Sequence, residues 1–179
     1  MQLSEEEIEA LVIYQVGAIA SYAKTLGLEI EHVRPHGAMY KQCATDFTFA
    51  CAVANAIKKC SPWLIYYGAA GDVTKKVGEY VGINVAQELF LDKTYNSDGT
   101  IDFEAKDNSN LDFNINRLKH LLSTSEINNN LDGKTIVEAD TIHFSNKYEN
   151  SVEIIKTAKT LITPEPVNYI KVKNSGWAE

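Results

Sequence analysis

The stretch Trp63–Asp72, which reads WLIYYGAAGD, decides the fold class of this 179-residue chain. Its first five residues are apolar or aromatic with little polar alternation, which is typical of a strand buried on both faces of a parallel sheet. The following glycine-rich turn leads into a predicted helix that runs to Val81 and stops at Gly82. A buried strand that runs through a tight turn into a helix predicts a parallel α/β fold.

The rest of the chain alternates strands and helices around this unit, which predicts a single domain over residues 1–179 with a mostly parallel sheet. Apolar periodicity and helix caps predict helices over 4–26, 46–60, 72–81, 113–122 and 151–161. Short apolar runs predict strands over 30–33, 63–67, 84–86, 135–139 and 169–172. A closed barrel of this type uses about eight strands. The sheet is therefore open, or is a barrel whose first wall is missing.

Charge and composition exclude several classes of partner. The formal net charge is −7, the only arginines are Arg34 and Arg117, and the lysines are scattered, so no basic stripe is available for nucleic acid or an anionic membrane surface. No apolar run approaches the roughly 20 residues that span a bilayer. The acidic N-terminus is no signal peptide, and three cysteines without a CxxC pair predict free thiols. We expect a cytoplasmic protein.

Four segments follow predicted strands and should line one rim, because parallel α/β folds bind ligands at the carboxyl ends of their strands. They are Arg34–Tyr40, Gly68–Asp72, Gln87–Asp98 and Asp140–Asn146. In the first segment, Pro35 fixes the turn and Gly37 lets the backbone approach a ligand. His36 between them is either a general base or anion-binding group, or a loop histidine bonded to a backbone carbonyl.

The other rim segments each leave two interpretations open. The amides of the Gly68–Asp72 loop could hold a carboxylate or phosphate at the helix start, but the loop lacks the Lys-Ser/Thr of a P-loop and also fits a plain turn. Glu88 and Asp92, near Lys93, suit acid–base work or a polar substrate. Asp140 is either a catalytic group or the cap of a turn. No GxSxG motif is present, and no cysteine pairs with a histidine.

Several of these segments, taken in order, resemble the LamB/YcsF family of lactam-utilisation proteins. The stretch HVRPHGAMY at residues 32–40 is similar to the family signature KPHGALY, with arginine in place of lysine and methionine in place of leucine. Further matches run from about Leu3 to Leu161. They comprise a helix at 12–18, a GLAG-like loop at 68–71, an ExFADRxY…DGT-like stretch at 88–100 and ADTI at 139–142.

The resemblance implies a fold and a function. Members of the family are the A subunit of prokaryotic 5-oxoprolinase, which with the B and C subunits opens the lactam 5-oxoproline to glutamate using ATP. Their fold is a distorted β/α barrel related to glycoside hydrolases and polysaccharide deacetylases. On this resemblance the predicted catalytic residues are His36, Glu88 and Asp140. The predicted substrate-binding residues are Arg34, Gly37, Tyr40, Gly68, Gly71, Asp92 and Lys93; no metal site is predicted, although His36, Asp140 and His143 are residue types that related barrels use for a divalent ion.

Departures from the family pattern leave two functions open. The family's acidic NCDxGE strand and its HPG segment do not occur in this sequence, and its HGD after ADTI is replaced at 145–147, with His143 displaced by two positions. One hypothesis is a lactam-opening subunit of an ATP-dependent complex. The other, which the missing motifs favour for the chain in isolation, is an N-terminally truncated, non-catalytic homologue that binds or assembles. Either way, we expect the open sheet to be covered by a second copy or another subunit.

Overall fold

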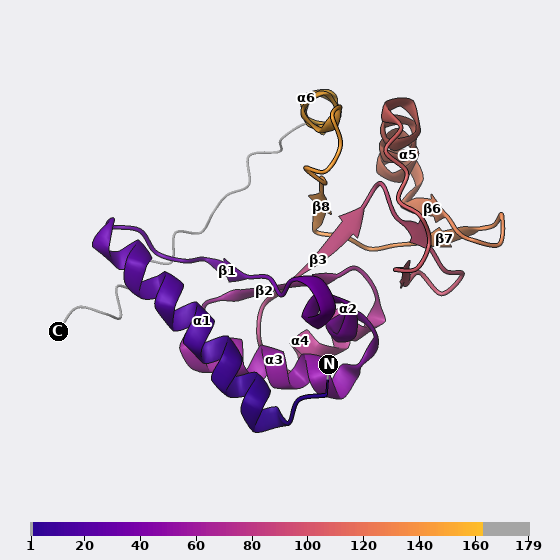
Figure 1. Ribbon diagram of the computed structural model, residues 1–179. Coiled ribbons are helices and arrows are strands. Elements are labelled where there is room, and N and C mark those ends of the chain that lie inside the picture. Colours follow the sequence, from indigo (N-terminus) through magenta and orange to yellow (C-terminus); the bar gives the residue numbers. More distant parts are fainter. Residues whose placement is uncertain (1, 163–179) are drawn as a thin grey trace.

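The computed structural model of the chain describes residues 2–162 and is built on a four-stranded parallel sheet in the order β1-β2-β3-β8 (Figure 1). Every neighbouring pair in this sheet is parallel; for example, Ala69 of β2 lies opposite Glu88 of β3, and Glu88 lies opposite Thr141 of β8. This arrangement confirms the predicted mostly parallel α/β class. The strands of this sheet are β1 (His32–Val33), β2 (Ile65–Ala69), β3 (Val85–Phe90) and β8 (Thr141–His143).

The helices begin and end largely where local signals place them. The predicted capping box of Ser4 and Glu7 starts the first helix, Asp46 caps the third, and Gly82 ends the fourth in the left-handed conformation. No helix within residues 2–162 is both long and apolar enough to cross a membrane. The helices are α1 (Glu5–Thr25), α2 (Gly37–Thr45), α3 (Phe47–Cys60), α4 (Asp72–Val81), α5 (Leu111–Thr124) and α6 (Ser151–Leu161).

Two hydrophobic clusters lie at the two ends of the sheet. Figure 1 shows β3 running from the part that holds α1 to α4 towards the part that holds α5, α6 and two small sheets. Ile57 and Tyr66 are fully buried in the first cluster, and Leu89 and Leu118 in the second. The small sheets are the antiparallel pairs β4 (Thr94–Tyr95) with β5 (Ile101–Asp102) and β6 (Glu126–Asn128) with β7 (Lys134–Ile136).

Three predicted boundaries are wrong, each because tertiary packing overrides a local pattern. The run at 135–139 is no strand of the main sheet, because β7 pairs with β6 and Val137 is buried in the second cluster. The fourth strand is β8 instead. Residues 37–45 form helix α2 where a rim loop was expected, and β3 continues to Phe90, so Glu88 lies inside a strand. The strand predicted at 169–172 falls outside the described residues.

Gly68 shows why the turn after β2 is rich in glycine. A Cβ atom at this position would lie 2.5 Å from Oγ1 and 2.8 Å from Cγ2 of Thr74 on α4. The Thr74 hydroxyl is buried and donates a hydrogen bond to the Ala69 carbonyl at 2.7 Å, so it has little freedom to move away. Gly68 therefore has a packing role that is independent of its predicted role in substrate binding.

We expect Gly68→Ala to lower the free energy of unfolding by about 1–3 kcal/mol, because it over-packs a closed contact. Urea denaturation followed by circular dichroism measures this change. The matched control is Gly17→Ala on the exposed side of α1, where no atom lies within 4 Å of the added Cβ. That control should raise the free energy of unfolding by about 0.5–1 kcal/mol. Equal stabilities of Gly68→Ala and the unsubstituted chain would contradict the packing argument.

Candidate functional site

The buried carboxylate of Glu88 is the centre of a polar cluster near the carboxyl ends of the strands. Glu88 is 5% exposed. Its Oε2 atom accepts hydrogen bonds from Nε of Arg34 at 2.7 Å and from the hydroxyl of Tyr40 at 2.8 Å. Its Oε1 atom lies 3.3 Å from Nδ1 of His143. Arg34 follows β1, Tyr40 is on α2 and His143 ends β8, so the sheet topology brings the cluster together.

These contacts fix the ionisation of Glu88. Burial on its own would raise the pKa of this carboxyl group. Hydrogen bonds from His143, Arg34 and Tyr40, together with the charge of Arg34, outweigh burial and hold the pKa of Glu88 below its usual value. Tyr40 is affected in the opposite sense, because burial and the neighbouring carboxylate both raise the pKa of its hydroxyl. At neutral pH, the cluster therefore holds an ionised Glu88 and a neutral Tyr40 that donates to it.

The ionised carboxylate orients His143. A carboxylate can only accept, so its contact with His143 requires a proton on Nδ1 and leaves the Nε2 lone pair available in the neutral imidazole. The His143 side chain is 30% exposed, so part of the ring is open to solvent or to a ligand. The ring also lies against Phe90, with centroids 4.5 Å apart. A carboxylate that fixes the tautomer of a solvent-accessible histidine is the arrangement of a general base.

Arg34 is held by aromatic faces as well as by its ion pair. Its guanidinium carbon lies 4.5 Å from the centroid of the Tyr40 ring and 5.9 Å from that of Phe90. Only 17% of its side chain is exposed. A planar guanidinium can stack on rings and donate in a fixed direction at the same time, which a lysine ammonium cannot do.

His36 lies at the edge of this cluster and does not contact Glu88. It is the exposed residue before α2, and its Nδ1 lies 3.3 Å from Nη1 of Arg34. Because a guanidinium only donates, the contact uses the Nδ1 lone pair and places the proton of a neutral ring on Nε2. Gly37 starts the helix at a φ of +59°, which glycine adopts without strain. The structure thus places both residues beside Arg34, while their roles stay predictions.

Asp92 and Lys93 lie away from the Glu88 cluster. Asp92 is 7% exposed and accepts a hydrogen bond from the Tyr148 hydroxyl at 3.1 Å. Lys93 forms an ion pair with Asp107. Asp92 and His143 nevertheless line the same small cavity, so His143 connects the two groups. The predicted rim is therefore divided into two parts. His143 lies between them, and the sequence indicated it only as a possible metal ligand and as a histidine displaced from its place in the family pattern.

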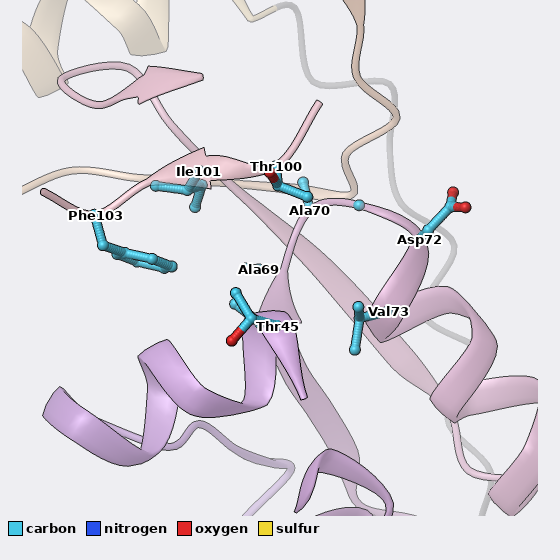
Figure 2. Close-up of a pocket in the computed structure, with 10 residues that line it drawn as sticks. Thr45, Ala69, Ala70, Asp72, Val73, Thr100, Ile101 and Phe103 are labelled. Atoms are coloured by element: carbon cyan, nitrogen blue, oxygen red, sulfur yellow. The ribbon is translucent and has the colours of Figure 1, made fainter. Parts of the chain in front are cut away.

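A separate, mostly apolar hollow lies where β2 meets α4 (Figure 2). Figure 2 shows Thr100, Ile101 and Phe103 on one side of it and Thr45 on the other, with the Asp72 carboxylate directed away. Gly71 lines the hollow at a φ of +135°, and its N–H donates to Oε1 of Gln87 at 3.3 Å. This contact occupies one of the amides that was expected to hold a ligand at the helix start.

Asp140 comes before β8, so the expectation that it ends a strand is wrong. Its Oδ2 accepts a hydrogen bond from the Gln87 N–H at 2.8 Å, and its own N–H donates to the Gln87 carbonyl at 2.9 Å. These bonds join the start of β8 to β3, while a catalytic role for Asp140 stays a prediction. No group of three or more His, Cys, Asp or Glu side chains within residues 2–162 is arranged to hold a metal ion.

Comparisons with known proteins show which proteins the chain is similar to. The LamB/YcsF family model matches residues 1–175. Proteins named as the A subunit of 5-oxoprolinase are 46% identical over 101 residues in Coprothermobacter proteolyticus, 45% over 101 residues in Bacillus subtilis and 37% over 123 residues in Tolumonas auensis. These matches cover 56%, 56% and 69% of this chain, but only 39%, 39% and 49% of the relatives. The chain thus spans between two fifths and half of the length of the curated relatives it matches.

A solved structure supports the same relationship. The crystal structure of a lactam utilization protein from Thermus thermophilus superposes with a TM-score of 0.77 at 29% sequence identity. The superposition covers 89% of this chain and 64% of the other. The likeness therefore extends over most of the chain and confirms the predicted, mostly parallel β/α architecture.

The lowered pKa of Glu88 makes a prediction about stability and pH. Its pKa is lower in the folded chain than in the unfolded one, so ionised Glu88 stabilises the fold above the unfolded pKa. That stabilisation is lost as the pH falls through the folded pKa. We expect Glu88→Gln to be most destabilising near neutral pH, and the difference from the unsubstituted chain to shrink below about pH 4. Urea denaturation across this pH range measures it.

The control for this prediction is Glu138→Gln, which removes an exposed carboxylate that pairs with Lys75 at 3.0 Å. An exposed ion pair contributes little to stability, so this substitution should change the free energy of unfolding only slightly across the whole pH range. A destabilisation by Glu88→Gln that stays constant across the pH range would contradict the assignment of an ionised, hydrogen-bonded Glu88.

Proposed function

The chain belongs to the LamB/YcsF family, and on that premise we propose that it acts as the A-type subunit of an ATP-dependent 5-oxoprolinase, which opens the lactam ring of 5-oxoproline to glutamate. The matched relatives are named as one lettered subunit of that enzyme, which supports a place in a multi-subunit complex. The partners proposed for it are the B and C subunits of that enzyme.

The observation that carries the proposal is the pairing of buried Glu88 with His143. Lactam hydrolysis needs a base that takes a proton from water while the oxygen attacks the amide carbonyl. The Nε2 atom of His143 is suited to this task because Glu88 holds the proton on the other nitrogen. Tyr40 is a positioning residue, since it is 5% exposed and donates to Glu88.

Arg34 and His36 supply the binding side of the proposed site. Glu88 holds the guanidinium through Nε, which leaves the Nη groups as donors at the exposed edge, next to His36. A guanidinium matches the geometry of a carboxylate, and 5-oxoproline carries one carboxylate beside its lactam. We assign Arg34 to the substrate carboxylate and His36 to the edge of the same subsite.

ATP does not fit the glycine-rich turn of this chain. The Gly71 N–H is already bonded to Gln87, and Asp72 places a carboxylate in the first turn of α4. The lysines of that helix, Lys75 and Lys76, form ion pairs with Glu138 and Asp72. A triphosphate would meet negative charge here rather than free donors. ATP binding is therefore assigned to the partner subunits, and no step of the proposed reaction in this chain passes through it.

The surface of α1 supports a further contact with another chain. Ile13, Tyr14 and Tyr22 are 39%, 76% and 69% exposed, and the small exposed residue Ala18 lies between the two tyrosines at helical spacing. This uncharged stripe suits close packing of a second helix. We propose that a second copy of the chain covers it, as the open sheet also suggested.

The proposed self-association predicts a dimer or higher oligomer at micromolar concentration. Static light scattering should give a mass of at least two chains of 19.9 kDa. Tyr14→Lys should lower that mass by placing a charge in the stripe, whereas Tyr80→Lys, at a residue on α4 that is 75% exposed, should leave it unchanged. A monodisperse monomer of the unsubstituted chain would contradict self-association.

The catalytic proposal predicts distinct effects for three histidines. With B and C subunits and ATP present, His143→Gln should lower kcat/KM for 5-oxoproline hydrolysis by about 10²–10⁴-fold, the usual contribution of a general base. His36→Ala should raise KM with a smaller effect on kcat, because His36 borders the binding side. His120→Gln is the control on α5, where the ring contacts Thr124 and Glu126.

Two outcomes of this assay would overturn the proposal. Full turnover by His143→Gln would remove the Glu88–His143 pair from the mechanism. No turnover by the unsubstituted chain, in a complex that forms with both partner subunits, would favour the non-catalytic binding or assembly role.

A further inference from the structure

The small cavity that Asp92 and His143 line lies between the end of β3, α5 and α6. The chain lines it with Asp92 from the loop after β3, Asn114 from α5, and Ser145 and Tyr148 from the loop before α6. His143 lines it too, so the cavity adjoins the Glu88 cluster. The cavity is small. The polar groups described above that line it are carboxylate, carboxamide and hydroxyl groups, and no lysine or arginine within residues 2–162 lines it.

Two residues that line this cavity each hold a buried oxygen atom without a hydrogen-bond partner. Oδ1 of Asp92 is one of them; only Oδ2 of that carboxylate is bonded, by the Tyr148 hydroxyl. Oδ1 of Asn114 is the other, although Nδ2 of the same side chain donates to the carbonyls of Asn108 and Asn110. Asp92 is 7% and Asn114 2% exposed. A buried acceptor left unpaired is destabilising, so two of them in residues that line one cavity indicate that a donor is missing.

The neighbouring cations of the chain do not supply that donor. Lys93 pairs with Asp107. Arg117 acts on Asp92 only through space, since its Nη groups donate to the carbonyls of Leu91, Lys93 and Asn128. Its Nε is also buried without a partner, but Arg117 does not line the cavity. The cavity is thus rich in acceptors and carries the negative charge of Asp92, which excludes an anion and favours a group with N–H donors.

We propose that this cavity binds the nitrogen end of the substrate, with Asp92 and Asn114 accepting its N–H groups. The identity of the ligand as a lactam rests on the function proposed above. In the closed ring the nitrogen has one N–H to donate; after ring opening it is an ammonium with three. Binding to a carboxylate therefore strengthens as the reaction proceeds, which is the direction that favours ring opening.

The position of His143 fits this assignment. Hydrolysis joins the water oxygen to the carbonyl carbon and breaks the bond between that carbon and nitrogen. The nitrogen takes up the proton that left the water and the one released by the new carboxylic acid, so a carboxylate and an ammonium result. A nitrogen held at Asp92 and Asn114 places the adjacent carbonyl carbon beside His143, which lines the same cavity and moves the proton. Tyr148 is a positioning residue that holds the Asp92 carboxylate.

The test uses the full chain, labelled with ¹⁵N, and two probes that lack the substrate carboxylate. The probes are 2-pyrrolidinone, a neutral lactam, and methylammonium. Both should shift the side-chain amide signals of Asn114 and the backbone signals of residues 143–148. Asp92→Asn should weaken methylammonium binding by about tenfold or more, because it removes a charge-assisted hydrogen bond. Asp72→Asn is the matched control, since it removes an exposed carboxylate that pairs with Lys76.

The outcomes separate this inference from the proposed function. Probe binding that shifts the Asn114 amide supports the inference even if Asp92→Asn fails to fold. Shifts confined to the Arg34 and Glu88 side of His143, no shifts with either probe, or an unchanged methylammonium affinity in folded Asp92→Asn would overturn it. Probe binding without ring opening in the assembled complex would instead count against the proposed function alone.

Discussion

The buried charge of Glu88 is the constraint on which the rest of the site depends. A carboxylate that is 5% exposed is costly unless donors surround it, and no residue near it in sequence supplies one. The donors come from the end of β1, from α2 and from β8, so the buried charge of Glu88 is compensated only when these three elements are in place.

Much of the fold could be predicted from the sequence because its signals are local. The Ser4–Glu7 capping box, the Asp46 cap and the left-handed Gly82 each depend on a few neighbouring residues, and all three mark helix ends in the structure. The choice between residues 135–139 and β8 as the fourth strand is not local. Both segments are short, and it is decided by the burial of Val137 in the second cluster and by the bonds of Asp140 to Gln87.

In the candidate site too, some features could be predicted from local sequence signals and others could not. Arg34, Tyr40 and Glu88 were predicted from motif positions at strand ends, and the structure brings them together. The link between His143 and Glu88 could not be predicted, because it requires β8 to lie next to β3 in one register. Asn114 carried no signal at all, since an asparagine on a helix is ordinary in sequence and becomes informative only when its carboxamide oxygen is buried without a partner.

His143 lies between two carboxylates, Glu88 and Asp92, which differ in their hydrogen bonding. Glu88 has every donor it needs, so it can hold an imidazole in one orientation but has little capacity left for a ligand. Asp92 has one oxygen bonded and one unpaired, so it is the carboxylate with binding capacity. A carboxylate whose oxygens are both hydrogen-bonded can orient a neighbouring side chain, whereas a carboxylate with an unpaired oxygen can bind a ligand. In the reaction we propose, that asymmetry, rather than the presence of acidic residues at the rim, distinguishes the side where water is activated from the side where the nitrogen leaves.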